Sequence, residues 1–600
     1  MNLETLSFNI TALREAYRNG AATPSTVIAE AYRRIESCGD GGIFISLLDR
    51  DKALAVAKAL GSFDETRPLW GIPFAVKDNI DVAGMATTAA CPAFAYMPAD
   101  NAYVVTRLIE AGAIPLGKTN LDQFATGLVG VRTPYPVPRN SFDEKMIPGG
   151  SSSGSAVAVA RGLVSFALGT DTAGSGRVPA GLNNIVGLKP SVGALSIRGV
   201  FPACRTLDCV SVFALTVDDA YEVFSAAAGY DAEEPYSRQM PRAPLSPMPP
   251  RLRVAVPDGA SRKFFGDRDS EIVFDRTVQD LVDLGAEIQP IDMSNFFAAA
   301  EMLYTGPWVA ERYHAMRALI ESNPDAIYPV TLKIVNQAKK FSATDTFEAL
   351  YKLAALKRAA NAALAGFAAL MVPTYPRPHA VAALAADAVG PNSELGTYTN
   401  FVNLLDLCAL ALPGQFRGDG FPSGVTLIAA AGADALIASI GCALHEKAGV
   451  PLGVTGVRCP ETQPRLNRAT ADEIELVVVG AHLSGMVLNH ELTARNARFL
   501  RASATTRDYK LFALPGGPPW RPGLLRVADG HGSEIATEVW ALKPESFADF
   551  VARIPAPLTI GTTRLADGTA PKGFLVEAEA TVAAENISRF GGWRQFIAHR

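Results

Sequence analysis

The stretch that decides the fold runs from Pro148 to Pro190 and reads PGGSSSGSAVAVARGLVSFALGTDTAGSGRVPAGLNNIVGLKP. It contains two glycine turns that carry serines, at 149–154 and 172–176, and a short apolar segment joins them. Because glycine tolerates positive φ, successive backbone N–H groups in such turns can point into one concavity and stabilise an oxyanion. The stretch therefore predicts a serine nucleophile held on tight backbone.

A serine hydroxyl needs a base to take its proton, and Lys77 is the best candidate. None of the seven histidines lies within or before the serine stretch, although distance in sequence does not exclude contact in space. Lys77 follows the apolar run GIPFAV, which favours a buried amine. To act as a base near neutral pH it must lower its pKa of about 10.4 by roughly three units, which full burial can supply.

These pieces together resemble the amidase signature family, whose motifs read GGSSGG, GTDxGGS and GLKP after an upstream lysine. The resemblance implies that Ser175 is the nucleophile and Lys77 the base. It also implies that Ser151, 24 residues before Ser175, is a bridging serine on a cis peptide that relays the proton. The implied oxyanion hole is formed by the backbone N–H groups of Thr172, Ala173, Gly174 and Ser175. Taken alone, each glycine turn is also typical of an ordinary Gly/Ser loop, and Lys77 of a surface lysine.

The composition is typical of a soluble enzyme. Of 600 residues, 48% are hydrophobic and 19% charged, which suffices for a sizeable core. A net charge of −5 gives no basic surface for nucleic acid. Seven cysteines without CxxC spacing predict neither disulfides nor a zinc site, and we expect no metal or other cofactor. With no apolar leader and no apolar run of spanning length, the sequence predicts a cytoplasmic protein that does not bind membranes.

The order of the predicted elements favours an α/β fold with a mixed sheet between helical layers, which the amidase resemblance also implies. Two amphipathic helices divided at 20–24 are predicted within 7–37, further helices at 270–284, 296–320 and 345–366, and strands at 368–372 and 422–429. We expect an amidase domain at 1–450, a linker at 451–472 and a smaller C-terminal α+β domain at 473–600.

Two other motifs point to different chemistry. Residues 112–119 match the phosphate-binding pattern G-x4-G-K-T, but a helical pattern precedes Gly112 and Pro115 has no N–H to offer a phosphate. Residues 150–154 match G-x-S-x-G, but no long strand precedes them as a nucleophile elbow requires. The context therefore disfavours a nucleotide-binding protein and an α/β-hydrolase.

The C-terminal segment suggests a second activity. Its layout resembles the γ-glutamylcyclotransferase-like fold, and GAHLSG (480–485) and LNHEL (488–492) resemble the C-terminal domain of the allophanate hydrolases, a group of amidase signature enzymes. In that group the tail is understood to decarboxylate N-carboxycarbamate, and His490 matches its essential histidine. The group is expected to read PLNHQ where this chain has Val487 and Glu491. A structural His490 in a domain that serves only dimerisation is the alternative.

Three residues outside the signature are candidates for binding substrate. Gly127 ends a loop that is expected to line the pocket, where its backbone could bind a substrate amide; a plain helix start is the alternative. Tyr304 and Arg312 lie about two helical turns apart, on one face if Pro307 does not break the helix. Arginine favours a carboxylate through a bidentate pair, unless it pairs with a surface glutamate.

The resemblance as a whole predicts an amidohydrolase that converts allophanate (urea-1-carboxylate), a small carboxylated urea, to N-carboxycarbamate and ammonia during urea or cyanuric acid breakdown. It implies a homodimer and a functional pairing with urea carboxylase. The signature supports this group because AGSGR stands at 173–177 where most amidases have GGSIR. The alternatives are a general amidase and the amidase subunit of a tRNA-dependent amidotransferase, each with an accessory C-terminal dimerisation domain.

Overall fold

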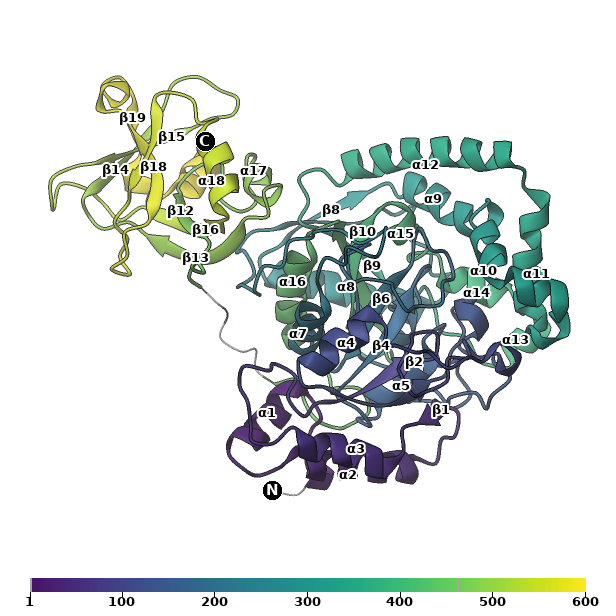
Figure 1. Ribbon diagram of the computed structural model, residues 1–600. Helices are drawn as coiled ribbons and strands as arrows, with labels where there is room; N and C mark the ends of the chain where they lie inside the picture. The colour runs from purple at the N-terminus through teal and green to yellow at the C-terminus, as the bar shows by residue number, and fades with distance from the viewer. Residues whose placement is uncertain (1–2, 461–464, 466) are drawn as a thin grey trace.

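Two bodies of unequal size make up the chain in Figure 1, a computed structural model that describes residues 3–460, 465 and 467–600. The larger, N-terminal body is built on an 11-stranded mixed sheet, and the smaller body contains a five-stranded and a three-stranded sheet. Each body has its own apolar core, and the core of the smaller one includes the buried Trp540 and Trp593. The predicted mixed α/β architecture is confirmed.

One edge of the large sheet is the first strand of the chain, residues 44–47. The opposite edge is formed by the strands at 253–257 and 287–291. In spatial order its strands are β1 (Phe44–Leu47), β3 (Ile114–Thr119), β2 (Pro73–Lys77), β4 (Phe166–Asp171), β6 (Cys209–Ala214), β5 (Val186–Lys189), β10 (Leu407–Pro413), β11 (Gly424–Ala430), β9 (Ala369–Pro373), β7 (Arg253–Pro257) and β8 (Glu287–Ile291).

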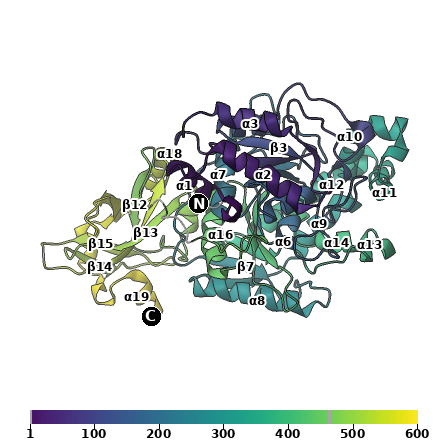
Figure 2. The ribbon, with the colours of Figure 1, turned by 90° about the horizontal axis from the view of Figure 1, so that it is seen from below.

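Helices cover both faces of this sheet, and Figure 2 shows α2 and α3 on one side of the body and α8 on the other. The helices are α1 (Ile10–Arg18), α2 (Pro24–Cys38), α3 (Arg50–Ala59), α4 (Tyr103–Glu110), α5 (Ser153–Ala160), α6 (Val178–Leu182), α7 (Val217–Ala227), α8 (Arg268–Asp283), α9 (Ser294–Thr305), α10 (Val309–Ser322), α11 (Pro329–Val335), α12 (Ala343–Ala363), α13 (Ala383–Ala386), α14 (Gly390–Leu395), α15 (Phe401–Leu404) and α16 (Asp434–Ala448).

Strand direction explains why the signature residues gather at one edge of the sheet. Strand β2 runs parallel to its neighbour β4, with Val76 opposite Leu168. Both strands therefore end at the same edge, where β2 delivers Lys77 and β4 leads into the turn at 172–176. Helix α5, which begins two residues after Ser151, packs against both strands.

The helix predicted at 296–320 is interrupted. Helix α9 ends at Thr305 and α10 begins at Val309, so Gly306 and Pro307 separate them. The missing N–H of proline and the flexibility of glycine make this a natural break. The prediction of one continuous helix carrying Tyr304 and Arg312 is therefore wrong. The two side chains nevertheless lie beside each other.

The C-terminal body begins at β12 (Ile474–Val478), a strand whose last three residues are buried and which ends just before the GAHLSG turn. Its five-stranded sheet has the order β13 (Arg498–Ala504), β16 (Ala536–Leu542), β12 (Ile474–Val478), β18 (Lys572–Val576), β17 (Leu558–Thr562), and its three-stranded sheet the order β15 (Pro522–Arg526), β14 (Tyr509–Ala513), β19 (Glu585–Asn586). Helices α17 (His490–Thr493), α18 (Pro544–Val551) and α19 (Trp593–His599) flank the sheets. Among the described helices of both bodies, none has the length and apolarity needed to cross a bilayer.

Candidate active site

Lys77 and Ser151 are in direct contact at the edge of the large sheet. Lys77 Nζ lies 2.8 Å from Ser151 Oγ and 2.7 Å from the hydroxyl of Thr170, near the end of β4. The side chains of Lys77 and Ser151 are fully buried. A neutral amine in this position can accept the proton of Ser151 while Thr170 holds it in place.

Burial lowers the pKa of Lys77 to about 7, because an ammonium loses its hydration there. The carboxylates of Asp122, Asp171 and Asp208 oppose this shift, and the charge of Arg312 adds to it. Near neutral pH a large fraction of Lys77 is therefore uncharged. This is the protonation state that a general base requires.

A cis peptide bond precedes Ser151, between it and Gly150, where the family resemblance placed one. Ser175 stands on the turn after β4 and is almost fully buried. Its hydroxyl donates to the carbonyl oxygen of Gly127 at 3.4 Å. The structure thus brings Gly127 against the predicted nucleophile and Ser151 against the predicted base.

The turn after β4 offers backbone donors beside Ser175. Among the described residues, the N–H groups of Thr172, Ala173 and Ser175 have no hydrogen-bond acceptor. The N–H of Gly174 differs, since it donates to the carboxylate of Asp171 at 2.9 Å. Three of the four predicted donors are therefore free to bind an oxyanion, and Gly174 instead fixes the turn.

A buried ion pair holds this turn in shape. Arg177 Nε and Nη2 each donate to the carboxylate of Asp171 at 2.9 Å, and the N–H of Gly176 donates to the same group. Although burial raises the pKa of Asp171, the charge and hydrogen bonds of Arg177 hold that pKa below its usual value. The ionised carboxylate thereby fixes the backbone on both sides of Ser175. The sequence pattern did not indicate this role, although both residues lie within 148–190.

Arg312 enters the site from α10 and is only partly satisfied. Its Nη1 donates to Thr126 Oγ1 at 3.2 Å and to the carbonyl oxygen of Ala125 at 3.3 Å. Its side chain is buried, and its Nε and Nη2 have no hydrogen-bond partner among the described residues. The guanidinium carbon lies 5.4 Å from the ring centre of Tyr304. Two buried guanidinium nitrogens, Nε and Nη2, are thus left for an anionic ligand.

The phosphate-binding pattern at 112–119 does not form a phosphate site. Lys118 lies within β3, fully buried, and its Nζ is 3.2 Å from a carboxylate oxygen of Asp78. It also donates to the hydroxyl of Thr87. Because this lysine already pairs with a buried carboxylate, the prediction against nucleotide binding agrees with the geometry.

Among the described residues, no cluster of three or more His, Cys, Asp or Glu side chains could hold a metal ion.

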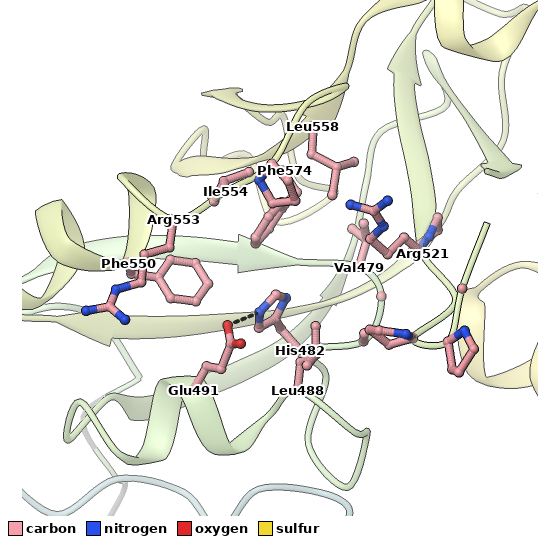
Figure 3. A pocket seen from close by; sticks show the side chains of 17 residues that line it. Val479, His482, Leu488, Glu491, Arg521, Phe550, Arg553, Ile554, Leu558 and Phe574 are labelled. Carbon is pink, nitrogen blue, oxygen red and sulfur yellow. Dashed lines mark hydrogen bonds and ion pairs between the residues drawn. The ribbon is translucent and has the colours of Figure 1, made fainter. Parts of the chain in front are cut away.

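A cavity of about 430 Å³ lies in the C-terminal body, well apart in sequence from the signature (Figure 3). His482 from the GAHLSG turn projects into it, and His482 Nε2 lies 3.0 Å from a carboxylate oxygen of Glu491. His490 is elsewhere: it lines a separate hollow of about 350 Å³ that also contains Arg253 and Glu287 of the larger body. The sequence pattern did not point to His482, and the catalytic role of His490 stays a prediction.

Family comparisons agree with this two-part organisation. A family model described as Amidase matches residues 26–437, and one described as Allophanate hydrolase C-terminal domain matches residues 474–598. The chain belongs to the amidase family. It combines the amidase signature fold with a C-terminal allophanate hydrolase domain, and it is a hydrolase of amides.

Within that family, the chain matches allophanate hydrolase over its whole length. The structure of Kluyveromyces lactis allophanate hydrolase is 40% identical with a TM-score of 0.79, and the match covers 99% of this chain and all of that one. Urea amidolyase of Saccharomyces cerevisiae is 42% identical over 576 residues, which are 92% of this chain but 31% of that protein. The chain spans about a third of the urea amidolyases that it matches.

A more distant relative represents the alternative interpretation. One subunit of the glutamyl-tRNA(Gln) amidotransferase of Exiguobacterium sibiricum is 31% identical over 455 residues, covering 69% of this chain and 92% of that protein. Its match leaves out about a third of this chain, whereas the allophanate hydrolase match includes the C-terminal body. The comparisons therefore favour allophanate hydrolase over the amidotransferase component.

Proposed function

We propose that this chain hydrolyses allophanate with Ser175 as nucleophile, Ser151 as proton relay and Lys77 as base. Water and allophanate would give ammonium and N-carboxycarbamate. The amidase domain is assigned to 1–450, the linker to 451–472 and the C-terminal domain to 473–600. The C-terminal domain would then decarboxylate N-carboxycarbamate. We place this enzyme in the cytoplasm, as a homodimer that works with a urea-carboxylating enzyme.

The observation that carries the choice of substrate is that Nε and Nη2 of the buried Arg312 guanidinium have no partner among the described residues. A buried arginine with two unpartnered nitrogens is costly unless a ligand completes its hydrogen bonds. The carboxylate of allophanate is planar and matches this fork. Tyr304 packs beside the guanidinium and limits the space, which favours a small substrate.

The chemical steps follow from the contacts at the sheet edge. Neutral Lys77 takes the proton of Ser151, which takes that of Ser175, and the Ser175 oxygen attacks the amide carbon of allophanate. This relay requires the Ser175 hydroxyl to turn from the Gly127 carbonyl, its present acceptor, toward Ser151. The free N–H groups on the turn stabilise the oxyanion. The proton returns through the relay to the leaving ammonia, and water then releases the acyl group by the same route.

Ammonia release by the purified chain, with no other protein present, tests the proposal. Biuret is the matched comparison because it carries a neutral amide where allophanate carries the carboxylate. The expected result is rapid release from allophanate and kcat/KM at least about 100-fold lower with biuret, the loss of one charge-assisted pair. Equal rates with both compounds would favour a general amidase. Activity that appears only with added partner proteins would favour the amidotransferase component.

A further inference from the structure

One segment connects the nucleophile with the arginine that is proposed to bind the carboxylate. Residues 122–132 lie between β3 and α5 and are almost entirely buried. The Ser175 hydroxyl donates to the carbonyl oxygen of Gly127 at 3.4 Å. One residue earlier, Thr126 Oγ1 accepts from Arg312 Nη1 at 3.2 Å. A shift of the 122–132 segment would therefore move both contacts together.

The same segment holds the peptide that precedes the relay serine. The N–H of Asp122 donates to the carbonyl oxygen of Ser151 at 3.0 Å. The N–H of Gly150 donates to the carbonyl oxygen of Leu128 at 2.8 Å. Because these two bonds hold both residues of the Gly150–Ser151 unit against the segment, the position of the Ser151 hydroxyl also depends on the shape of the segment.

The carboxylate of Asp122 holds the segment in that shape. The side chain of Asp122 is fully buried, its Oδ2 accepts from the N–H of Gly130 at 2.9 Å, and its Oδ1 accepts from the N–H of Arg132 at 2.8 Å. The packing around this group is close, since a Cβ at Gly127 would come within 2.6 Å of Oδ2. Both carboxylate oxygens are thus used to close the segment on itself.

The backbone between these bonds needs such support. Phe124 and Ala125 have φ angles of 54° and 53°, in the left-handed region that residues other than glycine seldom adopt. Such conformations persist only where the surrounding structure holds them. A side chain that accepts two N–H groups of its own segment supplies this hold.

We propose that Asp122 is a positioning residue for amide hydrolysis: through the 122–132 segment, its carboxylate holds both serines of the relay and the carboxylate-binding arginine in place. This inference rests on the proposed function for the roles of those three groups. Asp122 does not contact the substrate and acts only through its neighbours. Recognition of the substrate carboxylate and orientation of the nucleophile therefore share one support.

Asp122 also acts on the base through its charge. Burial lowers the pKa of Lys77, and among the carboxylates that oppose this shift Asp122 has the largest effect. Burial raises the pKa of Asp122 itself, whereas the charges of Arg132 and Lys77 and the two N–H bonds lower it. The other charged groups that act on Lys77 are Asp171, Asp208 and Arg312. Loss of the Asp122 charge should thus lower the pKa of Lys77.

Asp122→Asn tests this role, because the amide keeps the size of the side chain but offers one acceptor oxygen for the two N–H groups. The value of kcat should fall at least about 10-fold with allophanate and with biuret alike. The rise of kcat/KM with pH should move to lower pH. A merely structural role would lower activity without moving this profile, so an unmoved profile overturns the assignment.

Asp434→Asn is the matched control for the loss of a buried carboxylate. Asp434 on α16 is also buried, and its two oxygens accept from the backbone N–H and the hydroxyl of Ser191. This variant should keep the pH profile of the unmodified chain. A profile that moves equally in both variants would show that the shift does not come from Asp122.

Thr126→Val separates the two contacts of the segment and remains informative if Asp122→Asn does not fold. The change removes one acceptor from Arg312 and leaves the Gly127 carbonyl in place. KM for allophanate should rise about 10-fold while kcat changes less than about twofold. The rate with biuret should not change. No change with allophanate, or an equal loss with both compounds, would contradict the proposal.

Methanesulfonyl fluoride gives a measure of the nucleophile that needs no allophanate. The Ser175 oxygen forms a bond to sulfur and fluoride leaves, and intact mass spectrometry follows the rate of labelling. Near pH 8, labelling should be at least about 10-fold slower in Asp122→Asn and nearly unchanged in Asp434→Asn. Unchanged labelling in Asp122→Asn, or no labelling of the unmodified chain, would overturn this inference. If the unmodified chain releases no ammonia from allophanate, the proposed function fails, and the labelling rates still decide the role of Asp122.

Discussion

The two candidate sites differ in how they obtain a reactive group. At the signature site Lys77 and Ser151 are fully buried, and burial itself brings the pKa of Lys77 to about 7. In the C-terminal cavity the side chains of His482 and Glu491 are 15% and 40% exposed, and a neighbouring carboxylate holds the histidine. The first site thus depends on exclusion of water, whereas in the second a carboxylate orients a partly exposed ring through a 3.0 Å contact. Removing a buried group should accordingly cost more than removing an exposed one.

The largest effect is expected at the nucleophile. Ser175→Ala should lower kcat for ammonia release from allophanate by on the order of 10⁴-fold or more, because no other group can form the acyl intermediate. Steady-state ammonia release measures this loss. Ser225→Ala on helix α7 is the control and should keep its activity. Near-normal ammonia release by Ser175→Ala would contradict the mechanism.

Arg312 gives the next effect and separates binding of the carboxylate from chemistry. Arg312→Ala should lower kcat/KM for allophanate by about 100-fold or more, because the carboxylate loses its charged partner. The rate with biuret, which has no carboxylate, should change far less. Kinetics with both compounds decide this, and an equal loss with both would show that Arg312 only supports the fold.

The pH profile should show a smaller, tenfold change. With the pKa of Lys77 near 7, kcat/KM for allophanate should rise about tenfold from pH 6 to a plateau near pH 8, as the amine loses its proton. The carboxylate of Asp208 raises the pKa of Lys77, so Asp208→Asn should move this rise to lower pH. A profile that is flat between pH 6 and 8 would exclude Lys77 as the base.

Removal of the C-terminal body should have the smallest effect on the first step, the release of ammonia from allophanate. A chain ending at residue 460 retains every residue of the signature site and the large sheet. Its rate of ammonia release in the first step should stay within about twofold of that of the full chain. A loss much beyond twofold would mean that the two bodies depend on each other, contrary to the proposed domain boundaries.

The signature site was largely predictable because its residues stand in fixed order within one stretch and one upstream strand. The glycine turns and the lysine that follows an apolar run are visible in the sequence, and together they predict this site. The sequence did not indicate that Thr170 contacts Lys77, because that contact depends on β2 and β4 being parallel neighbours. The occupied N–H of Gly174 likewise follows from the turn that Asp171 fixes.

The C-terminal cavity was less predictable because residues from GAHLSG, α17, α18 and β18 meet only after folding. Two histidines stand eight residues apart there, and the motif directed attention to His490. The departure at Glu491 was noted as a mismatch, whereas in the structure this residue contacts His482. A pair formed between a turn and the following helix leaves no periodic pattern in the sequence.

In the proposed function, the break between α9 and α10 places substrate choice on a segment apart from the reacting groups. Tyr304 and Arg312 lie beside each other but come from either side of Gly306 and Pro307, more than a hundred residues beyond Ser175. Exchanging α9 and α10 between relatives would then change which amide is accepted, while Lys77, Ser151 and Ser175 stay in place. The scaffold therefore offers a route to enzymes that cleave other small ureas.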